Sequence, residues 1–274
     1  MDLPVLRSLH VHPVKSLAAL TVDEAVVEPW GLAGDRRWMV VDDAGTALTQ
    51  RQEPRLTGIS ARPAGDGGVE LSAPGREPLR VAPPERADTV VVELFGKKSE
   101  VVEAEPAAHA WLRGLLGAQV RLVHQDAPSY RRPLDPAYAR PGETVSLADG
   151  YPLLVTTVAS LDALNALIAG GDHREEGPLP MDRFRPNAVV DGVGPWEEDG
   201  WRRIAIGEVA FRVAKPCGRC VVTTTDQSTG ERGREPLRTL ARHRRAGTKL
   251  IFGQNLVPEG TGTIRVGDPV RVLE

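Results

Sequence analysis

The sequence contains very little cysteine. Cys217 and Cys220 are the only two cysteines among 274 residues. Two sulfur atoms exclude a disulfide-stabilised scaffold and any iron–sulfur cluster that is held by four cysteines of this chain. If these sulfurs carry chemistry, they act as one pair or one at a time.

Long apolar runs are missing as well. No stretch of eighteen consecutive apolar residues occurs, and Arg7, His10, His12 and Lys15 interrupt the N-terminal segment. A membrane-spanning helix and a secretory signal peptide both need an uninterrupted apolar stretch. We therefore expect a cytoplasmic protein that has no membrane partner.

Positive charge is not in excess, because the formal net charge is -3. Proteins that bind nucleic acids or anionic membranes usually carry a broad basic surface. We expect no nucleic acid among the partners, although a small anionic ligand is compatible with this charge balance.

Aromatic residues make up only 4% of the chain, whereas glycine (28) and proline (23) are plentiful. This composition favours many short strands joined by turns. Apolar patterns predict strands through the first hundred residues, among them Val5–His12, Trp38–Val41 and Val90–Phe95. The first part of the chain is therefore expected to be a β domain.

Helical spacing is confined to Pro106–Leu116, Thr157–Ala169 and a short segment that begins at Pro236. The β-branched run Val221–Thr225 predicts a strand, and residues 263–273 predict a closing hairpin. A chain of this length is large enough for two domains. We predict a β-dominant α+β fold of two β-rich domains with a few short helices.

The Cys-x-x-Cys pair has three interpretations: a dithiol redox site, half of a zinc site, or a turn in which one sulfur is a ligand. Dithiol sites usually lie at a helix N-terminus, and the run after Cys220 is poor helix material. A structural zinc site needs four ligands, and His173 and His243 lack the paired spacing of zinc fingers. His10 and His12 share one strand face, and we interpret them as half-exposed polar residues of an edge strand.

Residues three apart in an extended segment point to opposite faces, so Cys217 and Cys220 need not converge on one ion. Arg219 lies between them in the sequence, and a guanidinium beside a thiol favours the thiolate, which is the form that binds metals. A site with a single thiolate ligand is therefore credible, while a buried inert cysteine stays the alternative for either position.

Several motifs, taken together, resemble one family. The segment Lys215–Cys220, followed by Thr223–Asp226, resembles the signature of the MOSC domain of molybdenum-cofactor proteins. Other segments that resemble the same family occur in the expected order along nearly the whole chain: His12–Ser16, Gly31–Trp38, Thr49–Leu56, Phe184–Asn187, Phe252–Asn255, Gly262–Ile264 and Val266–Val270.

The resemblance implies a two-part layout, with a MOSC N-terminal β-barrel domain in residues 1–104 and a MOSC domain in residues 105–274. The branch of the family with this layout includes the mitochondrial amidoxime reducing component and YcbX-like bacterial proteins, which reduce N-hydroxylated compounds. YcbX-like proteins continue into a ferredoxin-like domain, whereas this sequence stops at Glu274. An external electron-transfer protein and its reductase are therefore expected as partners.

The resemblance also implies the site residues. Cys220 would be the catalytic protein ligand to molybdenum in a bound molybdenum cofactor (Mo-molybdopterin), with Cys217 in a supporting role. Lys15, Arg36, Arg185 and Arg219 match positions that hold the pterin and its phosphate, and Ser16 and Asn187 match neighbouring polar contacts. A buried phosphate needs several charge-assisted donors, each contributing roughly 1.5 to 3 kcal/mol.

The function implied by the resemblance is a molybdenum-cofactor-dependent oxidoreductase that removes oxygen from small N-hydroxylated or N-oxygenated substrates. The irregular loop Tyr130–Arg140 is expected near the mouth of the site. Gly150 and Asn255 stand where mitochondrial relatives have a larger or aromatic side chain, which puts the substrate preference in question. The alternatives are a cofactor carrier or sulfur-transfer protein and, less favoured, a non-catalytic β-barrel interaction module.

Overall fold

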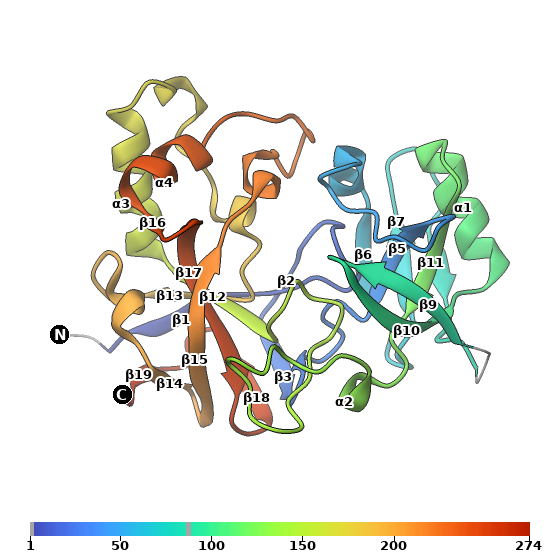
Figure 1. The fold of residues 1–274 in the computed structure, drawn as a ribbon, viewed down its shortest axis with the longest axis horizontal. Helices are drawn as coiled ribbons and strands as arrows, with labels where there is room; N and C mark the ends of the chain where they lie inside the picture. Colours follow the sequence, from blue (N-terminus) through green and yellow to red (C-terminus); the bar gives the residue numbers. More distant parts are fainter. Residues whose placement is uncertain (1–2, 86–88) are drawn as a thin grey trace.

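The computed structural model describes residues 3–85 and 89–274. Figure 1 shows a larger lobe, which holds both chain ends at its outer side, and a smaller lobe beside it. The larger lobe is built on a nine-stranded sheet that consists of β1 (Val5–Val11), β2 (Leu20–Val22), β12 (Leu153–Thr157), β13 (Ala188–Asp191), β14 (Arg203–Ile206), β15 (Val209–Gly218), β16 (Arg245–Ala246), β17 (Lys249–Pro258) and β19 (Val270–Val272).

A three-stranded sheet and several helices complete the larger lobe. The sheet consists of β3 (Glu24–Glu28), β4 (Gly31–Leu32) and β18 (Gly262–Arg265). The α-helices are α3 (Val158–Ala169) and α4 (Leu237–His243), and the 3-10 helices are η2 (Arg174–Glu176), η3 (Met181–Phe184), η4 (Glu197–Gly200) and η5 (Val221–Thr224).

The smaller lobe contains two further sheets and the helix α1 (Pro106–Leu116) at its edge (Figure 1). A connection that includes the short helix α2 (Pro128–Arg131) leads back to the larger lobe. The four-stranded sheet has the order β5 (Trp38–Asp42), β11 (Val120–His124), β10 (Lys97–Glu103), β9 (Thr89–Leu94), and the three-stranded sheet consists of β6 (Ser60–Pro63), β7 (Val69–Ser72) and β8 (Leu79–Val81), with η1 (Pro54–Gly58) before it.

The large sheet curls toward a barrel. Its order is β19-β14-β15-β17-β12-β13-β1-β2, and all its neighbours are antiparallel except β12 and β13. The amide of Leu6 donates to Asp268 O at 2.9 Å and that of Gly267 donates to Leu6 O at 2.8 Å, so β1 returns to the segment before β19. No pairing between named strands closes the ring in the described residues. The β-dominant α+β fold class is confirmed.

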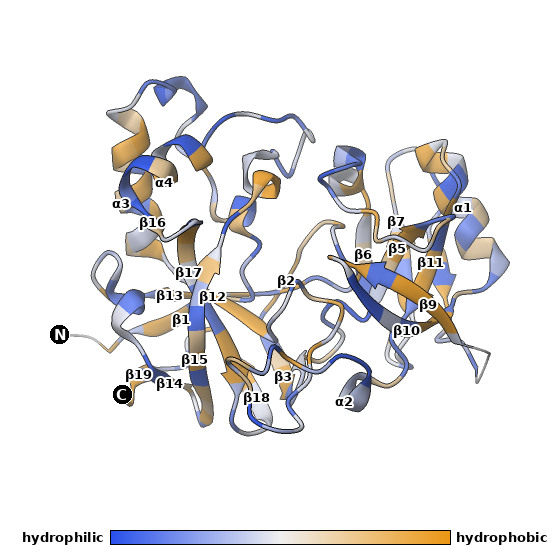
Figure 2. Ribbon diagram, viewed as in Figure 1, coloured by the Kyte–Doolittle hydropathy of each residue, from blue (hydrophilic) through white to orange (hydrophobic). Residues whose placement is uncertain are grey.

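Each lobe has its own apolar core. Leu9, Val155 and Phe211 are buried in the core of the larger lobe, while Trp38 and Leu112 belong to that of the smaller lobe. Figure 2 shows the hydrophobic colour along strands such as β9, whereas the neighbouring β10 carries hydrophilic residues at its start. Among the described helices, none combines the length and apolar character needed to cross a membrane.

The predicted helices are confirmed, because α1 has the predicted bounds and α3 begins one residue later than predicted. The lobes, however, do not follow the order of the chain. β1 pairs with β13 and β3 pairs with β18, so early strands complete the sheets of the larger lobe. The domain boundary between residues 104 and 105 stays a prediction.

Two local predictions are wrong. Val221–Thr225 is not a strand, because its first four residues form η5. The hydroxyls of Thr223 and Thr224 donate to the carbonyls of Cys220 and Val221, both at 2.8 Å, and such bonds compete with strand formation. The C-terminal strands also do not pair as a hairpin, since β18 pairs with β3 and β19 with β14.

Candidate functional site

The predicted site residues lie in loops that enter and leave strands of both lobes, and several have an unusual backbone. Ser16, Arg36 and Arg185 have φ values of 67°, 48° and 52°. Across residues 3–85 and 89–274 only five non-glycine residues have a positive φ. A fourth member of this set, Phe95, packs its ring against the cations of Lys15 and Arg51. Such strained residues cluster at functional sites, so the backbone itself marks this region.

Arg36 connects two of the predicted motifs, its own segment Gly31–Trp38 and the segment Phe184–Asn187. Its Nη1 donates to Asp35 Oδ2 at 2.6 Å and to Asn187 Oδ1 at 3.2 Å, and its Nη2 donates to Arg185 O at 3.3 Å. Asn187 is buried, and its Nδ2 donates to His10 O at 3.1 Å. These bonds fix the loop of Arg185 against the end of β1.

Arg185 is a half-buried cation whose Nη2 atom is buried and has unused hydrogen-bonding capacity. Its Nη1 donates to Gln227 Oε1 at 3.2 Å, and the amides of Gln227 and Gln50 bond each other at 3.0 and 3.1 Å. Gln50 Nε2 also donates to Ser16 O at 2.9 Å. Burial, and then the nearby Arg36, lower the pKa of Arg185 to about 9. Its Nη2 is buried without a partner among the described residues, so it can donate to an anionic oxygen.

Lys15 is 3% exposed, and its Nζ forms a short ion pair with Asp149. Burial lowers the pKa of Lys15 to about 8, despite the opposite effect of the Asp149 carboxylate. The Phe95 ring centroid lies 5.0 Å from Lys15 Nζ. Lys15 is therefore a desolvated ammonium whose charge changes just above neutral pH.

The two sulfur atoms contact different guanidinium groups. Arg219 Nη1 donates to Cys217 Sγ at 2.9 Å, and its Nη2 donates to Phe184 O at 2.7 Å. Arg51 Nη2 donates to Cys220 Sγ at 3.1 Å. Arg219 therefore contacts one of the two thiols, as its place between them suggested, but that thiol is Cys217. The guanidinium that donates to Cys220 belongs to Arg51 of the smaller lobe.

Residue types alone did not single out some members of the site: Asp35, Gln50, Arg51, Asp149 and Gln227. Gln50 and Arg51 lie in the segment Thr49–Leu56, which resembles the family, and this resemblance was the only sequence signal for them.

His12 was expected to be half-exposed, but it is fully buried. Burial, Arg36 and Arg185 hold the pKa of His12 well below its usual value, and its Nδ1 has no partner among the described residues.

The donor set fits the molybdenum cofactor that the sequence predicts. Arg185 Nη2 and Arg219 Nε are buried N–H donors without partners in the described part of the chain. His12 Nδ1 is a buried acceptor without a partner there, because the neutral ring donates from Nε2 to Pro186 O. Cations and N–H donors of this kind suit a pterin and its phosphate. Cys220 adds a soft sulfur at the same place, which suits a metal that also binds other sulfurs.

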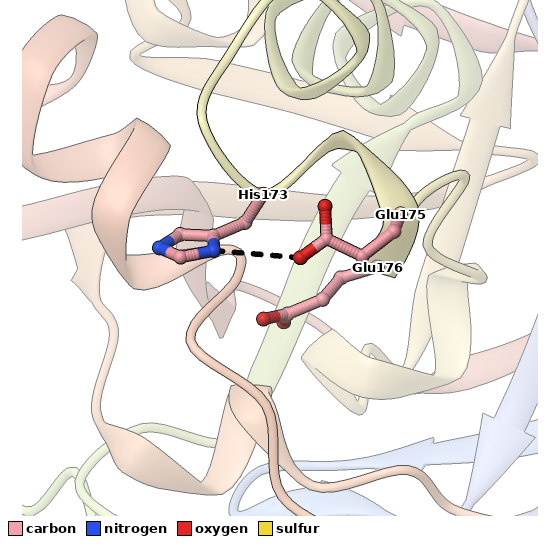
Figure 3. Close-up of side chains that lie close together, drawn as sticks. All are labelled: His173, Glu175 and Glu176. Atoms are coloured by element: carbon pink, nitrogen blue, oxygen red, sulfur yellow. Dashed lines mark ion pairs between the residues drawn. The ribbon is translucent and has the colours of Figure 1, made fainter.

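A second cluster, on η2, does not make a convincing metal site. Figure 3 shows His173, Glu175 and Glu176 close together. The Glu176 carboxylate already accepts bonds from the amides of Arg234 and Glu235, both at 2.8 Å. Arg234 Nη1 also lies 3.4 Å from His173 Nε2, where it would repel a cation. We assign this cluster a structural role.

The charge of Lys15 predicts a pH-dependent anion affinity. Sulfate should raise the Tm of cofactor-free protein more at pH 7 than at pH 9.5, because Lys15 loses its proton above a pKa of about 8. Affinity can fall by up to about tenfold for each pH unit above that pKa. In Lys15→Met the sulfate-dependent shift should be smaller and should change less between the two pH values, with the remaining change due to Arg185, whose pKa is about 9. An unchanged pH dependence in this variant would contradict the assignment.

Models of two protein families match most of the chain. The family model described as the MOSC N-terminal beta barrel domain matches residues 3–119, and that of the MOSC domain matches residues 142–271. The chain is 35% identical to mitochondrial amidoxime-reducing component 1 of Mus musculus, covering 98% of this chain and 82% of that protein. It is 30% identical to the molybdenum cofactor sulfurase of Oryza sativa, covering 90% of this chain and 32% of that protein.

Proposed function

The chain belongs to the family of MOSC-domain proteins that includes the mitochondrial amidoxime-reducing components, and from this premise we propose that it is a molybdenum-cofactor-dependent reductase of N-hydroxylated compounds. Family membership itself establishes a function related to the molybdenum cofactor. The observation that carries the proposal is the combination of buried, unpartnered guanidinium donors on Arg185 and Arg219 with the Cys220 sulfur, to which Arg51 donates.

In this proposal Lys15, Arg36, Arg185 and Arg219 hold the pterin and its phosphate, together with the polar contacts of Ser16 and Asn187. Cys220 is the protein ligand to molybdenum. When bound, the cofactor supplies the two-electron removal of oxygen from an N–O bond, so that R–NH–OH, two electrons and two protons give R–NH2 and water.

The residues of the chain itself bind and orient. Arg51 places a positive charge 3.1 Å from the Cys220 sulfur, which offsets the negative charge of a thiolate ligand. Asp35 and Asn187 hold the Arg36 guanidinium in place at 2.6 and 3.2 Å. Cys217 bonds the Arg219 side chain, so its role is to position that cation.

A cofactor carrier or sulfur-transfer protein is the second candidate, favoured by the similarity to molybdenum cofactor sulfurases. A carrier must release its ligand, whereas a reductase must keep it through many turnovers. The interlocked bonds of Arg36, Asn187 and Arg185 favour retention, which is why we place the reductase first.

We further propose that electrons come from a separate electron-transfer protein and its reductase, and that the protein works in the cytoplasm. Two cysteines are too few for an iron–sulfur cluster with four cysteine ligands. The sequence contains no Gly-x-Gly-x-x-Gly segment that opens a helix after a strand, so it has no recognisable binding motif for NADPH.

One experiment tests the proposed function. The purified protein should carry close to one molybdenum and one pterin per chain, and reduce benzamidoxime with reduced viologen but not with NADPH alone. Zinc at that stoichiometry without pterin would reject it. Full molybdenum occupancy without turnover by viologen would favour the carrier, and repeated turnover with NADPH alone would reject the separate donor.

A further inference from the structure

A cleft of about 280 Å³ opens next to the cofactor residues. It lies between the tip of the β9–β10 hairpin, the loop that follows α2, and the middle of β15. The side chains that define it include Phe95, Lys97, Lys98, Arg132, Tyr151 and Lys215. The expectation that the Tyr130–Arg140 loop lies near the mouth agrees with this position, and the volume suits a small ligand.

The cleft begins one side chain away from the proposed metal ligand. Phe95 and Asp149 line both the cleft and the cofactor site. The Phe95 ring centroid lies 4.8 Å from Arg51 Cζ, and Arg51 Nη2 lies 3.1 Å from Cys220 Sγ. A molecule in the cleft can therefore extend one end toward Cys220.

The charges of the cleft are mostly positive and mostly uncompensated. Within the described residues, Lys97, Lys98, Arg132 and Lys215 form no ion pair with a carboxylate, whereas Arg131 pairs with two. Arg132 donates only to backbone carbonyls, among them Ala148 O at 2.8 Å. Because cations in a partly enclosed site gain from an opposite charge, this lining favours an anion.

Two carboxylates also line the cleft, and both are engaged. Asp149 forms the ion pair with Lys15, and Asp135 Oδ1 accepts a bond from the amide of Ala137 at 3.1 Å. Lys215 Nζ lies 4.2 Å from the Tyr138 ring centroid and 5.2 Å from that of Tyr151. These rings hold its ammonium at the rim without neutralising it.

Phe95 adds an apolar wall at a strained position. It has a φ of 53° and, with Gly96 at 74°, forms the two-residue turn of the β9–β10 hairpin. Such turns usually carry asparagine or aspartate before glycine, and a bulky residue there is strained. The side chain is nevertheless 47% exposed. A Cβ at Gly150, which also lines the cleft, would meet nothing within 4 Å, so the cleft has room for a flat ligand.

We propose that this cleft is the substrate pocket and that it selects planar N-hydroxylated compounds that carry a carboxylate. The carboxylate binds among Lys97, Lys98 and Lys215, the flat part lies against Phe95, and the N–O group extends toward Cys220. This inference rests on the proposed reductase function, and it adds the class of substrate.

The test compares two substrates and two inert probes. The ratio of kcat/KM for 4-carboxybenzamidoxime over benzamidoxime should fall about tenfold in Lys215→Gln and further in Lys97→Gln/Lys98→Gln/Lys215→Gln, mainly through KM. Arg62→Gln, which removes an exposed charge on β6, is the matched control and should keep the wild-type ratio. The loss should also shrink at high salt.

Binding of benzoate and benzamide, measured by calorimetry without any turnover, separates this proposal from the proposed function. Wild-type protein should bind benzoate about tenfold more tightly than benzamide, and the triple variant should lose that preference. Equal binding of both probes, or an unchanged preference in the triple variant, would overturn the pocket. Absence of turnover with a retained benzoate preference would reject the reductase and keep the anion pocket.

Discussion

Replacing Cys220 by alanine is expected to lower kcat/KM for benzamidoxime by at least about a thousandfold, whereas Cys217→Ala should lower it by less than about threefold. The two substitutions are expected to differ in effect because the two sulfurs occupy different environments. Cys220 Sγ contacts Arg51 from the smaller lobe, and Cys217 Sγ contacts Arg219 from its own loop. Because we propose Cys220 alone as the metal ligand, the two substitutions are expected to differ in their effects.

Metal analysis and activity should be measured on the same preparations of both variants. Cys220→Ala should lose molybdenum or hold it in an inactive form, while Cys217→Ala should keep close to one molybdenum per chain. Arg219 retains its bond to Phe184 O at 2.7 Å without Cys217, which explains the mild effect. Equal and complete loss of activity in both variants, with the fold intact, would instead support a dithiol site.

Elements whose formation depends on local sequence were predictable. The apolar spacing and the flanking Pro106 and Gly117 gave the bounds of α1, and Gly117 ends the helix with a φ of 64°. Pairing between distant strands was not predictable in this way. The closing hairpin was expected because its strands are neighbours in sequence, but β18 finds its partner about 240 residues away, at β3.

The site shows the same limit. Motif residues such as Arg36 and Asn187 could be named from the sequence, and the structure joins them at 3.2 Å. Their partners could not be named, because Arg51 reaches Cys220 across the two lobes and Gln227 meets Gln50 from the other end of the chain. The strained backbone of Ser16, Arg36 and Arg185 also has no sequence signal, since none of them is glycine.

The half-buried guanidinium of Arg185 leads to a prediction in which cofactor affinity and protein stability change in opposite directions. Arg185→Gln should weaken cofactor retention by about tenfold to a hundredfold, because it removes a charge-assisted donor. It should also raise the Tm of cofactor-free protein by about 2 °C or more, because burial disfavours this guanidinium and its Nη2 has no partner among the described residues. Pterin content after gel filtration and thermal unfolding measure the two effects.

Arg183, two residues earlier in η3, provides the matched control. Its guanidinium donates to Thr224 O and to Asp226 Oδ2, each at 2.9 Å, so its charge is compensated within the protein. Arg183→Gln should therefore lower Tm and change pterin content little while the protein stays folded. A fall in Tm with full pterin content in Arg185→Gln would contradict the assignment, because it would mean that Arg185 stabilises the fold and does not hold the ligand.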